Sequence, residues 1–439
     1  MSLPATSPIA ASTASTASTA SAPRPLVPRC DLFCTVVDNF GDIGVCWRLA
    51  RQLVREHGWS VRLWVDDLAS FRYLRPDIDP TLARQRCDGV DVRRWEAEWR
   101  AAPDDAADAN PGMAADDNAP GDIVIEAFAC HIPDAYVTAM HARKLAGNPP
   151  VWINLEYLSA EDWVEDCHLM KSTHPQLGLV KTFFFPGFTE RTGGLARERE
   201  LLSRRDAFLA SPALRDAWWQ RTLGLPAAPT DALVVSLFAY ENAALPALFA
   251  QWAASETPIV CLVPQGRIAP AAGAWFGREA LAPGESASRG ALTAYGLLFV
   301  PQAEFDTLLW ACDVNFVRGE DSFVRAQWAA KPFVWHIYPQ AENAHHIKLD
   351  AFLARYLGES RSTTATTTPD VEPPTHAARE ALRTFWHLWN GYANTTPDWS
   401  ALAACLPELN SHARAWANRQ VALPDLARQL ASFVENQVK

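Results

Sequence analysis

The sequence lacks the features that would assign it to several common classes of protein. No apolar run approaches the roughly 18 residues of a membrane span, so we expect no transmembrane helix. The net charge is −11, which argues against a non-specific nucleic-acid binder, because such proteins present a basic face. The nine cysteines are odd in number and include no C-x-x-C pair. This usage favours reduced thiols in a cytoplasmic protein over a disulfide framework or a zinc site.

Ligand-binding motifs are also scarce. The dinucleotide pattern G-x-G-x-x-G is missing, and the best candidate turn holds only Gly41 and Gly44 in the spacing G-x-x-G. The pair His345-His346 does not have the spacing of metal ligands on one helix face. A D-x-D sequence at 77–79 lies between two prolines with no strand before it, which favours a plain turn. These sequences therefore give no indication of a metal site.

Length and composition indicate a globular protein of two domains. The chain has 439 residues, of which half are hydrophobic and a fifth are charged. Three segments are rich in Ala, Ser, Thr, Asp or Pro: 1–29, 101–120 and 359–377. The first lacks the basic start and apolar middle of a secretory signal. We expect a disordered tail and two disordered surface insertions.

The first half of the chain alternates short apolar strands with helices. The predicted strands cover 32–37, 61–65, 123–128 and 151–155, and predicted helices follow the first strand and cover 135–145. This alternation predicts a parallel sheet with both faces covered. The aromatic stretch 183–188 is too broken for a regular element. It fits a loop that walls a cleft, or a loop anchored in the core by its rings.

A second alternating series follows a charged helical segment at 197–225. Its predicted strands cover 233–238, 258–263, 297–300, 314–317 and 333–337, and its helices cover 241–254, 305–312 and 322–330. Two such series predict two facing Rossmann-like domains, at 30–225 and 226–405, with a ligand site in the cleft between them. We expect the C-terminal helices, 406–439, to pack back on the N-terminal domain.

The stretch Asp38-Asn39-Phe40-Gly41-Asp42-Ile43-Gly44 links the first strand to the first helix. Ligands of open α/β sheets bind at the carboxyl ends of the strands, where this turn lies. Two carboxylates here would repel a diphosphate, so they suit a cationic substrate or proton transfer. In the alternative interpretation, Asp42 caps the helix and Asp38 forms the turn.

A second strand–glycine–helix turn, Arg318-Gly319-Glu320-Asp321-Ser322, lies in the second series. The start of a helix presents free N–H groups and a partial positive charge, which suit a phosphate. Arg318 and the hydroxyl of Ser322 could add hydrogen-bond donors to a diphosphate. In the alternative interpretation, Asp321 or Ser322 caps the helix and Glu320 is solvated.

Several long stretches resemble the EarP family, protein-arginine rhamnosyltransferases that modify bacterial translation elongation factor P (EF-P). They cover 38–50, 152–161, 183–189 and 318–328 with Pro339-Gln340, and the resemblance extends from Asp31 to about Phe433 outside the insertions. It implies a GT-B fold and an inverting, metal-independent transfer of rhamnose from dTDP-β-L-rhamnose to an arginine of EF-P. The resemblance further implies that EF-P so modified rescues ribosomes stalled at polyproline, and that the transfer needs no cofactor besides the donor. The donor would bind in the C-terminal domain and the acceptor in the N-terminal domain.

The resemblance also implies roles for individual residues. Asp42 would be the general base, Asp38 would orient the acceptor guanidinium, and Glu320 would position donor or acceptor. Asn39, Phe40 and Gly41 would approach the sugar and diphosphate. The other expected donor contacts are Tyr240, Gln302 and Phe305 at the nucleoside, and Arg318, Gly319, Asp321 and Ser322 at the ribose and diphosphate. Phe238 and Phe299 are additional candidates outside this set.

Two alternative functions stay open. One is another GT-B enzyme that uses a different nucleotide sugar or acceptor. The other is a protein that docks on a translation factor without chemistry. The presence of Asp38, Asp42 and Glu320 at two cleft-facing turns argues against a purely binding role.

Overall fold

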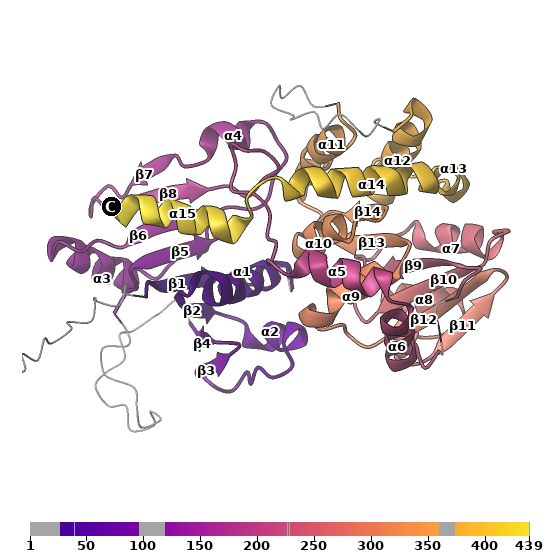
Figure 1. The fold of residues 1–439 in the computed structure, drawn as a ribbon, viewed down its shortest axis with the longest axis horizontal. Helices are drawn as coiled ribbons and strands as arrows, with labels where there is room; N and C mark the ends of the chain where they lie inside the picture. Colours follow the sequence, from indigo (N-terminus) through magenta and orange to yellow (C-terminus); the bar gives the residue numbers. More distant parts are fainter. Residues whose placement is uncertain are drawn as a thin grey trace, which may run out of the picture.

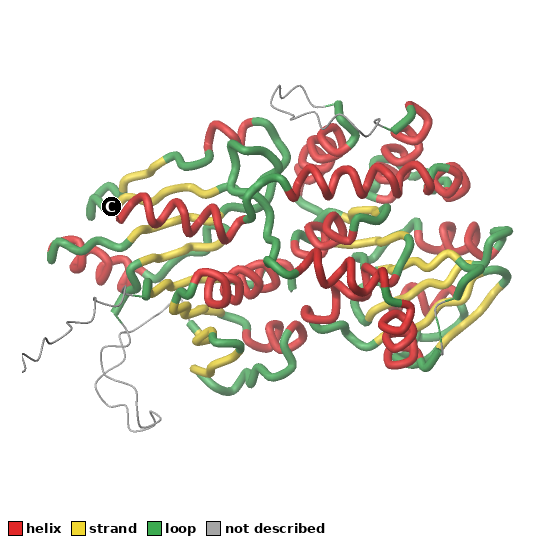
Figure 2. The backbone as a smooth tube through the Cα atoms, in the orientation of Figure 1, coloured by secondary structure: helices red, strands yellow, loops and turns green. Residues whose placement is uncertain are grey.

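The computed structural model describes residues 27–38, 40–95, 119–225, 227, 229–359 and 374–438. The predicted disordered tail and both predicted insertions lie mostly outside these ranges, and so does Asn39. The described residues form two α/β domains side by side (Figure 1), and each domain is built on one sheet. Figure 2 shows the strands of both domains enclosed by helices. The two-domain α/β arrangement predicted from the sequence is confirmed.

The first domain contains an eight-stranded sheet in the order β3-β4-β2-β1-β5-β6-β8-β7. Its inner strands are parallel, and the edge strands β3 and β7 are antiparallel to their neighbours. The strands are β1 (Arg29–Cys34), β2 (Ser60–Val65), β3 (Arg84–Cys87), β4 (Val90–Arg94), β5 (Ile123–Ala127), β6 (Val151–Leu155), β7 (Lys171–Thr173) and β8 (Val180–Phe184). The helices are α1 (Gly41–His57), α2 (Leu68–Leu74), α3 (Asp134–Leu145) and α4 (Trp163–Cys167).

The second domain contains a six-stranded sheet in the order β11-β12-β10-β9-β13-β14. Its strands are β9 (Leu233–Leu237), β10 (Ile259–Pro264), β11 (Ser286–Arg289), β12 (Leu292–Leu297), β13 (Val314–Arg318) and β14 (Phe333–His336). Its helices are α5 (Leu201–Ala210), α6 (Pro212–Leu223), α7 (Leu245–Ala253), α8 (Ala269–Trp275), α9 (Gln302–Ala311), α10 (Asp321–Ala329), the short η2 (Ala341–Asn343), α11 (Ala344–Tyr356), α12 (His376–Trp389), α13 (Trp399–Ala404) and α14 (Leu406–Val421).

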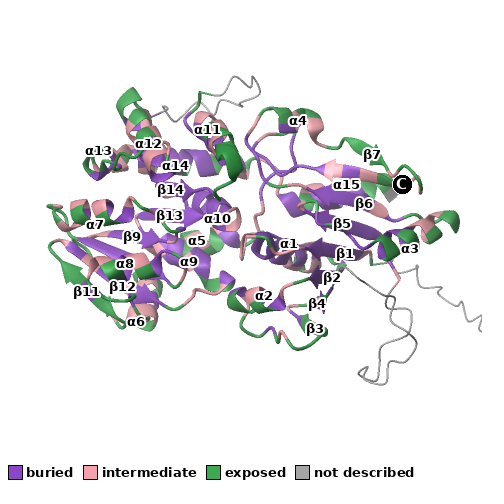
Figure 3. Ribbon diagram, turned by 180° about the vertical axis from the view of Figure 1, so that it is seen from behind, coloured by how far each residue is buried: buried purple, intermediate pink, exposed green. Residues whose placement is uncertain are grey.

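Each sheet is the centre of its own core. The sequence of β10, Ile-Val-Cys-Leu-Val-Pro, is apolar at every position, and all six residues are buried. Strands of this kind need helices on both faces of the sheet. Figure 3 shows the result, with buried strands in the middle of each domain and exposed residues on the outer surfaces of the helices.

The C-terminal segment contacts both domains. Trp416 of α14 donates from Nε1 to Gln327 Oε1 of α10 at 2.8 Å, so α14 packs on the second domain. The chain then crosses over, and α15 (Leu426–Val438) packs against α1 of the first domain (Figure 1). The expected return to the N-terminal domain is therefore made by α15 alone. The reason is that Leu409 and Trp416 of α14 belong to the core of the second domain.

Three predicted elements and one predicted domain boundary differ from the structure. The first domain was predicted to extend to 225, but α5 and α6 pack on the second domain, because Phe208 and Trp219 belong to its core. The predicted strand 32–37 is β1, which ends at Cys34 because Val37 turns away and is 66% exposed. The predicted strand 297–300 corresponds only to the end of β12, since Leu298 is also exposed. The predicted aromatic loop begins inside β8, where Phe183 and Phe184 pair with β6. Polar edge strands such as β3 lack the apolar pattern by which the inner strands were found.

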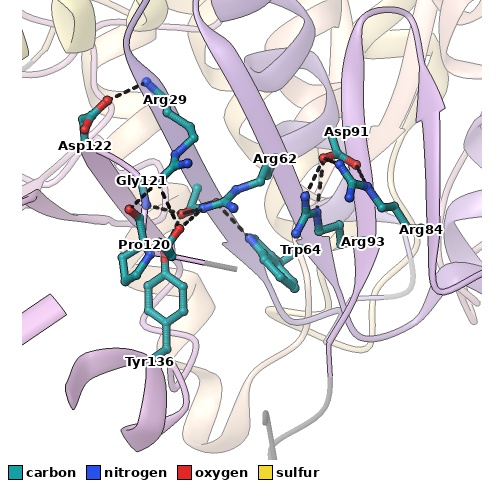
Figure 4. Close-up of polar contacts among 12 residues, drawn as sticks. Arg29, Arg62, Trp64, Arg84, Asp91, Arg93, Pro120, Gly121, Asp122 and Tyr136 are labelled. Carbon is teal, nitrogen blue, oxygen red and sulfur yellow. Dashed lines mark hydrogen bonds and ion pairs between the residues drawn. The ribbon is translucent and has the colours of Figure 1, made fainter. Parts of the chain in front are cut away.

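A buried carboxylate lies near the amino end of β1, away from the turn that follows this strand. Asp31 accepts hydrogen bonds from Arg62, from Trp64 Nε1 at 3.0 Å, from Gly121 N at 2.6 Å and from the hydroxyl of Tyr136. Figure 4 shows Arg62 and Tyr136 converging from different elements. These hydrogen bonds offset part of the desolvation cost of the buried charges, and the network joins β1 to β2, to the loop before β5 and to α3.

Among the described helices, none combines the length and the hydropathy that crossing a membrane requires.

Candidate active site

The two turns predicted from the sequence lie together at the seam between the domains. The first precedes α1 and the second precedes α10, and neither helix has a side-chain cap at its start. Gln302 Nε2 of α9 donates to the carbonyl of Gly44 at 2.7 Å and to Asp321 Oδ2 at 3.1 Å, so this side chain bridges the two turns. Residues almost 300 positions apart in the chain therefore form one site.

Two pockets meet at this seam and share Asp38, Gly41 and Gly319. The first spans about 540 Å³, part of it open to solvent, and we call it the aromatic pocket. Its lining includes Phe40, Phe238, Phe299, Phe305, Gln302, Arg318, Asp321 and Ser322. The second spans about 800 Å³, also partly open to solvent, and we call it the carboxylate pocket. Its lining includes Asp42, Glu320, Phe128, Tyr157, Trp335, Tyr338 and Lys348.

Arg318 is the cation of the aromatic pocket. Its side chain is 4% exposed, and its guanidinium lies 4.8 Å from the ring centre of Phe238 and 4.6 Å from that of Tyr240. Its Nε and Nη1 are buried and form no hydrogen bond, and the nearest carboxylate oxygen, on Asp38, is 3.9 Å from Nη1. Unused donors on a buried guanidinium suit an anionic ligand such as a phosphate.

Asp321 and Ser322 are engaged within the protein. The hydroxyl of Ser322 donates to the carbonyl of Arg318 and accepts from the backbone N–H of Arg318 at 3.1 Å. This hydroxyl therefore closes the turn, which differs from the predicted donation to a diphosphate. Asp321 accepts from Arg48 Nε at 2.6 Å and from Gln302. Neither side chain caps α10, so the alternative capping interpretation is wrong.

Asp42 also does not cap its helix. Its Oδ2 accepts from the backbone N–H groups of Val37 at 2.8 Å and Asp38 at 2.9 Å, and its Oδ1 accepts from the hydroxyl of Tyr157 at 3.1 Å. The reason is that side chains of a helix point back toward its N-terminus, here onto the preceding loop. Burial raises the pKa of Asp42, while these three donors act in the opposite direction.

Glu320 is the second carboxylate with a perturbed pKa. One oxygen accepts from the backbone N–H of Leu158 at 3.0 Å. Enclosure between the domains raises the pKa of Glu320 to about 8, and the charge on Asp42 adds to this effect, whereas Leu158 and Lys348 oppose it. Carboxylates with raised pKa values in a shared pocket are suited to proton transfer near neutral pH.

Asp38 stands between the two pockets. Its Oδ2 accepts from the hydroxyl of Tyr240 at 2.6 Å, and its backbone carbonyl accepts from Gly41 N at 2.6 Å. Burial, together with Asp38, raises the pKa of Tyr240. Tyr240, predicted as a nucleoside contact, is absent from the lining of the aromatic pocket and holds Asp38 instead.

Gln302 and Phe305 line the aromatic pocket, where a nucleoside contact was predicted. Gln302 Oε1 is buried and accepts no hydrogen bond. An unpaired carbonyl oxygen beside aromatic rings can accept from an N–H group of a planar ligand. Phe238 and Phe299, the additional candidates, line the same pocket.

Several residues of the carboxylate pocket have no role that was predicted from the sequence. Tyr157 stacks on Phe128 with ring centres 4.3 Å apart and planes 16° apart, and Lys348 Nζ lies 5.8 Å from the Tyr157 ring. Phe128 has a φ of 57°, a left-handed conformation that costs energy in a non-glycine residue. Phe128 and Tyr157 directly follow the carboxyl ends of β5 and β6, a position from which the sequence could have predicted a place in the site. Lys348 lies on α11, and no sequence pattern marks it as a site residue.

Within the residues that the structure describes, no three His, Cys, Asp or Glu side chains come together in a way that could hold a metal ion.

Comparison with known proteins identifies the family to which this chain belongs. A family model described as "Elongation-Factor P (EF-P) rhamnosyltransferase EarP" matches residues 30–435. A protein of Pseudomonas putida named protein-arginine rhamnosyltransferase is 51% identical over 407 residues, which cover 92% of this chain and 98% of the relative. A Pseudomonas aeruginosa protein of the same name is 45% identical over 403 residues, with coverage of 92% and 98%.

A solved structure, "Structural basis for EarP-mediated arginine glycosylation of translation elongation factor EF-P", is 37% identical. It superposes with a TM-score of 0.61, and the match covers 93% of this chain and 99% of that one. The two facing Rossmann-like domains confirm the GT-B fold that was predicted. The chain therefore belongs to the EarP family of EF-P rhamnosyltransferases.

Proposed function

We propose that this protein transfers L-rhamnose from dTDP-β-L-rhamnose to an arginine side chain of EF-P, with inversion at the anomeric carbon. The observation that carries the proposal is the meeting of two chemically different pockets at Asp38, Gly41 and Gly319. One pocket suits a nucleoside diphosphate and the other suits a cation. The relatives named above are protein-arginine rhamnosyltransferases, which supports the same reaction.

The aromatic pocket supports a nucleotide-sugar donor. Its phenylalanines offer faces and edges on which a pyrimidine can pack, and the unpaired Gln302 Oε1 can accept from the base. The unused N–H groups of Arg318 and the uncapped start of α10 can stabilise the charge that develops on the leaving diphosphate. These groups supply positive charge from the protein itself, which supports transfer without a metal.

The carboxylate pocket supports a guanidinium acceptor. A free guanidinium has a pKa above about 12 and is a poor nucleophile while its charge is delocalised. Asp38, Asp42 and Glu320 can localise that charge away from the attacking nitrogen. As the bond from this nitrogen to the anomeric carbon forms and the bond to the diphosphate oxygen breaks, Asp42 takes the proton of the nitrogen. The sugar passes through an oxocarbenium-like state.

Intact-mass spectrometry of EF-P tests the proposal. EF-P is incubated with this protein and dTDP-β-L-rhamnose in the presence of EDTA, and we expect a gain of one deoxyhexose that maps to an arginine. NMR of the product sugar reads the anomeric configuration, and competition between thymidine and uridine diphosphates identifies the nucleotide. Donor binding by calorimetry without any transfer would favour the other GT-B function, with a different acceptor. Failure to bind the donor would contradict the proposal.

The proposed acceptor is a translation factor, which supports a cytoplasmic location, as do the nine free cysteines. We propose that the modified EF-P relieves ribosome stalling at polyproline. A polyproline reporter translated with modified or unmodified EF-P tests this step separately from the chemistry.

A further inference from the structure

A buried network of charges crosses the seam between the domains, next to the two pockets. Arg48 of α1 contacts Asp321 at 2.6 Å, Glu198 at 3.2 Å and Asp306 at 3.5 Å. Arg325 of α10 contacts Glu198 and Asp306, each at 2.6 Å. The side chains of the two arginines are only 3% and 1% exposed. The network therefore joins a helix of the first domain to two helices of the second.

The contact between Arg48 and Asp321 lies close in the chain to both proposed catalytic carboxylates. Arg48 lies on the same helix as Asp42, and its partner Asp321 directly follows Glu320 at the start of α10. The contact between Arg48 and Asp321 consequently links the helix that carries one proposed catalytic carboxylate to the helix start that carries the other. Gln302 makes a second link, between Gly44 and Asp321.

We propose that Arg48 is a positioning residue that sets the distance between Asp42 and Glu320 by holding Asp321. This inference rests on the proposed function. Two carboxylates that act on one guanidinium from different domains need a rigid connection, and a guanidinium paired with carboxylates on several sides provides one. Buried ion pairs contribute little net stability, because desolvation offsets the attraction. Positioning of the two carboxylates therefore accounts for the buried Arg48–Asp321 ion pair better than stabilisation of the fold does.

The main experiment compares Arg48→Met with Arg51→Met. Methionine keeps an unbranched apolar stem but removes the charge. Arg51 lies on the same helix and is a matched control, because it pairs at 3.1 Å with Asp88 inside the first domain. We expect Arg48→Met to lower kcat on EF-P about 100-fold, the effect of a misplacement of about 1 Å. We expect the KM for EF-P to change less than threefold and Arg51→Met to keep near-normal kcat. Arg48→Lys, which cannot reach several carboxylates at once, should fall between them.

A second variant keeps the inference testable if Arg48→Met does not fold. Asp321→Asn preserves the size of the side chain and removes the charge that Arg48 contacts. We expect a similar loss of kcat, and the double variant should be no slower than the slower single variant, because both changes break the Arg48–Asp321 contact that is proposed to set the distance. Additive losses, or an Arg48→Met kcat within threefold of Arg51→Met, would overturn the positioning role. If the wild-type protein transfers no rhamnose in the same assay, the proposed function itself fails.

Discussion

At the scale of single residues, the two proposed catalytic carboxylates differ in how they are held. Asp42 accepts three hydrogen bonds, two of them from backbone N–H groups, so its position is fixed. Glu320 accepts one, from Leu158, and its pKa is raised further from the ordinary value. A fixed carboxylate suits the general base. A carboxyl group with a pKa of about 8 is mostly neutral at pH 7, and a bound guanidinium would lower this pKa, so that Glu320 carries the charge that balances the substrate only when the acceptor is in place.

The first prediction concerns Asp42→Asn. We expect kcat to fall by about 10²- to 10⁴-fold, the usual contribution of a general base. The fold should be kept, because the amide oxygen can still accept from the N–H groups of Val37 and Asp38. Steady-state kinetics and thermal unfolding measure the two effects. Asp166→Asn, at an exposed position on α4, is the control, and near-normal turnover by Asp42→Asn would remove the assignment of the base.

The second prediction concerns the pH dependence of stability at Glu320. Its folded pKa of about 8 lies above the unfolded value of about 4.3, so the folded protein favours the neutral form. The stabilising contribution is complete below the unfolded pKa and is lost as pH rises toward 8. Because Glu320→Gln mimics the neutral form, its melting temperature relative to wild type should rise between pH 5 and 8 and then level off. A difference that does not change with pH would contradict the raised pKa.

At the scale of elements, the turn between β13 and α10 depends on close approach of the backbone to Asp38. Gly319 has a φ of 62°, and a Cβ there would lie 3.0 Å from Asp38 Oδ2 and 3.4 Å from the Tyr240 hydroxyl oxygen. The glycine therefore permits both the left-handed turn and the contact across the seam. The proposed positioning role of Arg48 belongs to this scale as well, because it concerns two helices.

The third prediction concerns Gly319→Ala. We expect a loss of about 1–2 kcal/mol in the free energy of unfolding from left-handed strain, and a loss of kcat/KM because Asp38 is displaced. Gly224→Ala is a matched control, since Gly224 has a φ of 71° and nothing within 4 Å of the added Cβ. The control should lose stability without losing activity. Equal kcat/KM in the two variants would show that activity does not depend on the close approach of Gly319 to Asp38.

At the scale of the whole molecule, α15 returns from the second domain and covers α1, the helix that carries Asp42 (Figure 1). Leu426, Leu430 and Val434 of α15 are buried in the core of the first domain. The stability of the first domain therefore depends on the last helix of the chain.

The fourth prediction concerns Leu430→Ala. Removal of a fully buried leucine side chain should lower the free energy of unfolding by about 2–5 kcal/mol. Denaturant unfolding measures this as a lower midpoint. Arg428→Ala, at an exposed position on the same helix, should change stability by no more than about 0.5 kcal/mol. If Leu430→Ala unfolds at the wild-type midpoint, α15 does not stabilise the first domain.

The sequence predicted the inner strands of both sheets well, but it predicted the edge strands and the packing of the C-terminal helices less well. The inner strands were found because parallel strands buried on both faces are continuous apolar runs, as in β10. Edge strands such as β3 and β7 were missed because their residues are largely polar or exposed. The packing of α15 on the first domain was expected. The same prediction for α14 was wrong, because the apolar face of a helix does not indicate which of two cores it will join.

The sequence by itself determined the two strand–glycine–helix turns and the kinds of side chain on them, since local patterns fix local elements. The tertiary structure decided how these side chains are used. It directed Asp42 to the loop before its helix, used the hydroxyl of Ser322 inside the turn, and joined Arg48 to Asp321. It also raised the pKa of Glu320. The physical reason is that burial, charge and hydrogen bonding depend on neighbours in space, and at this seam those neighbours come from both domains.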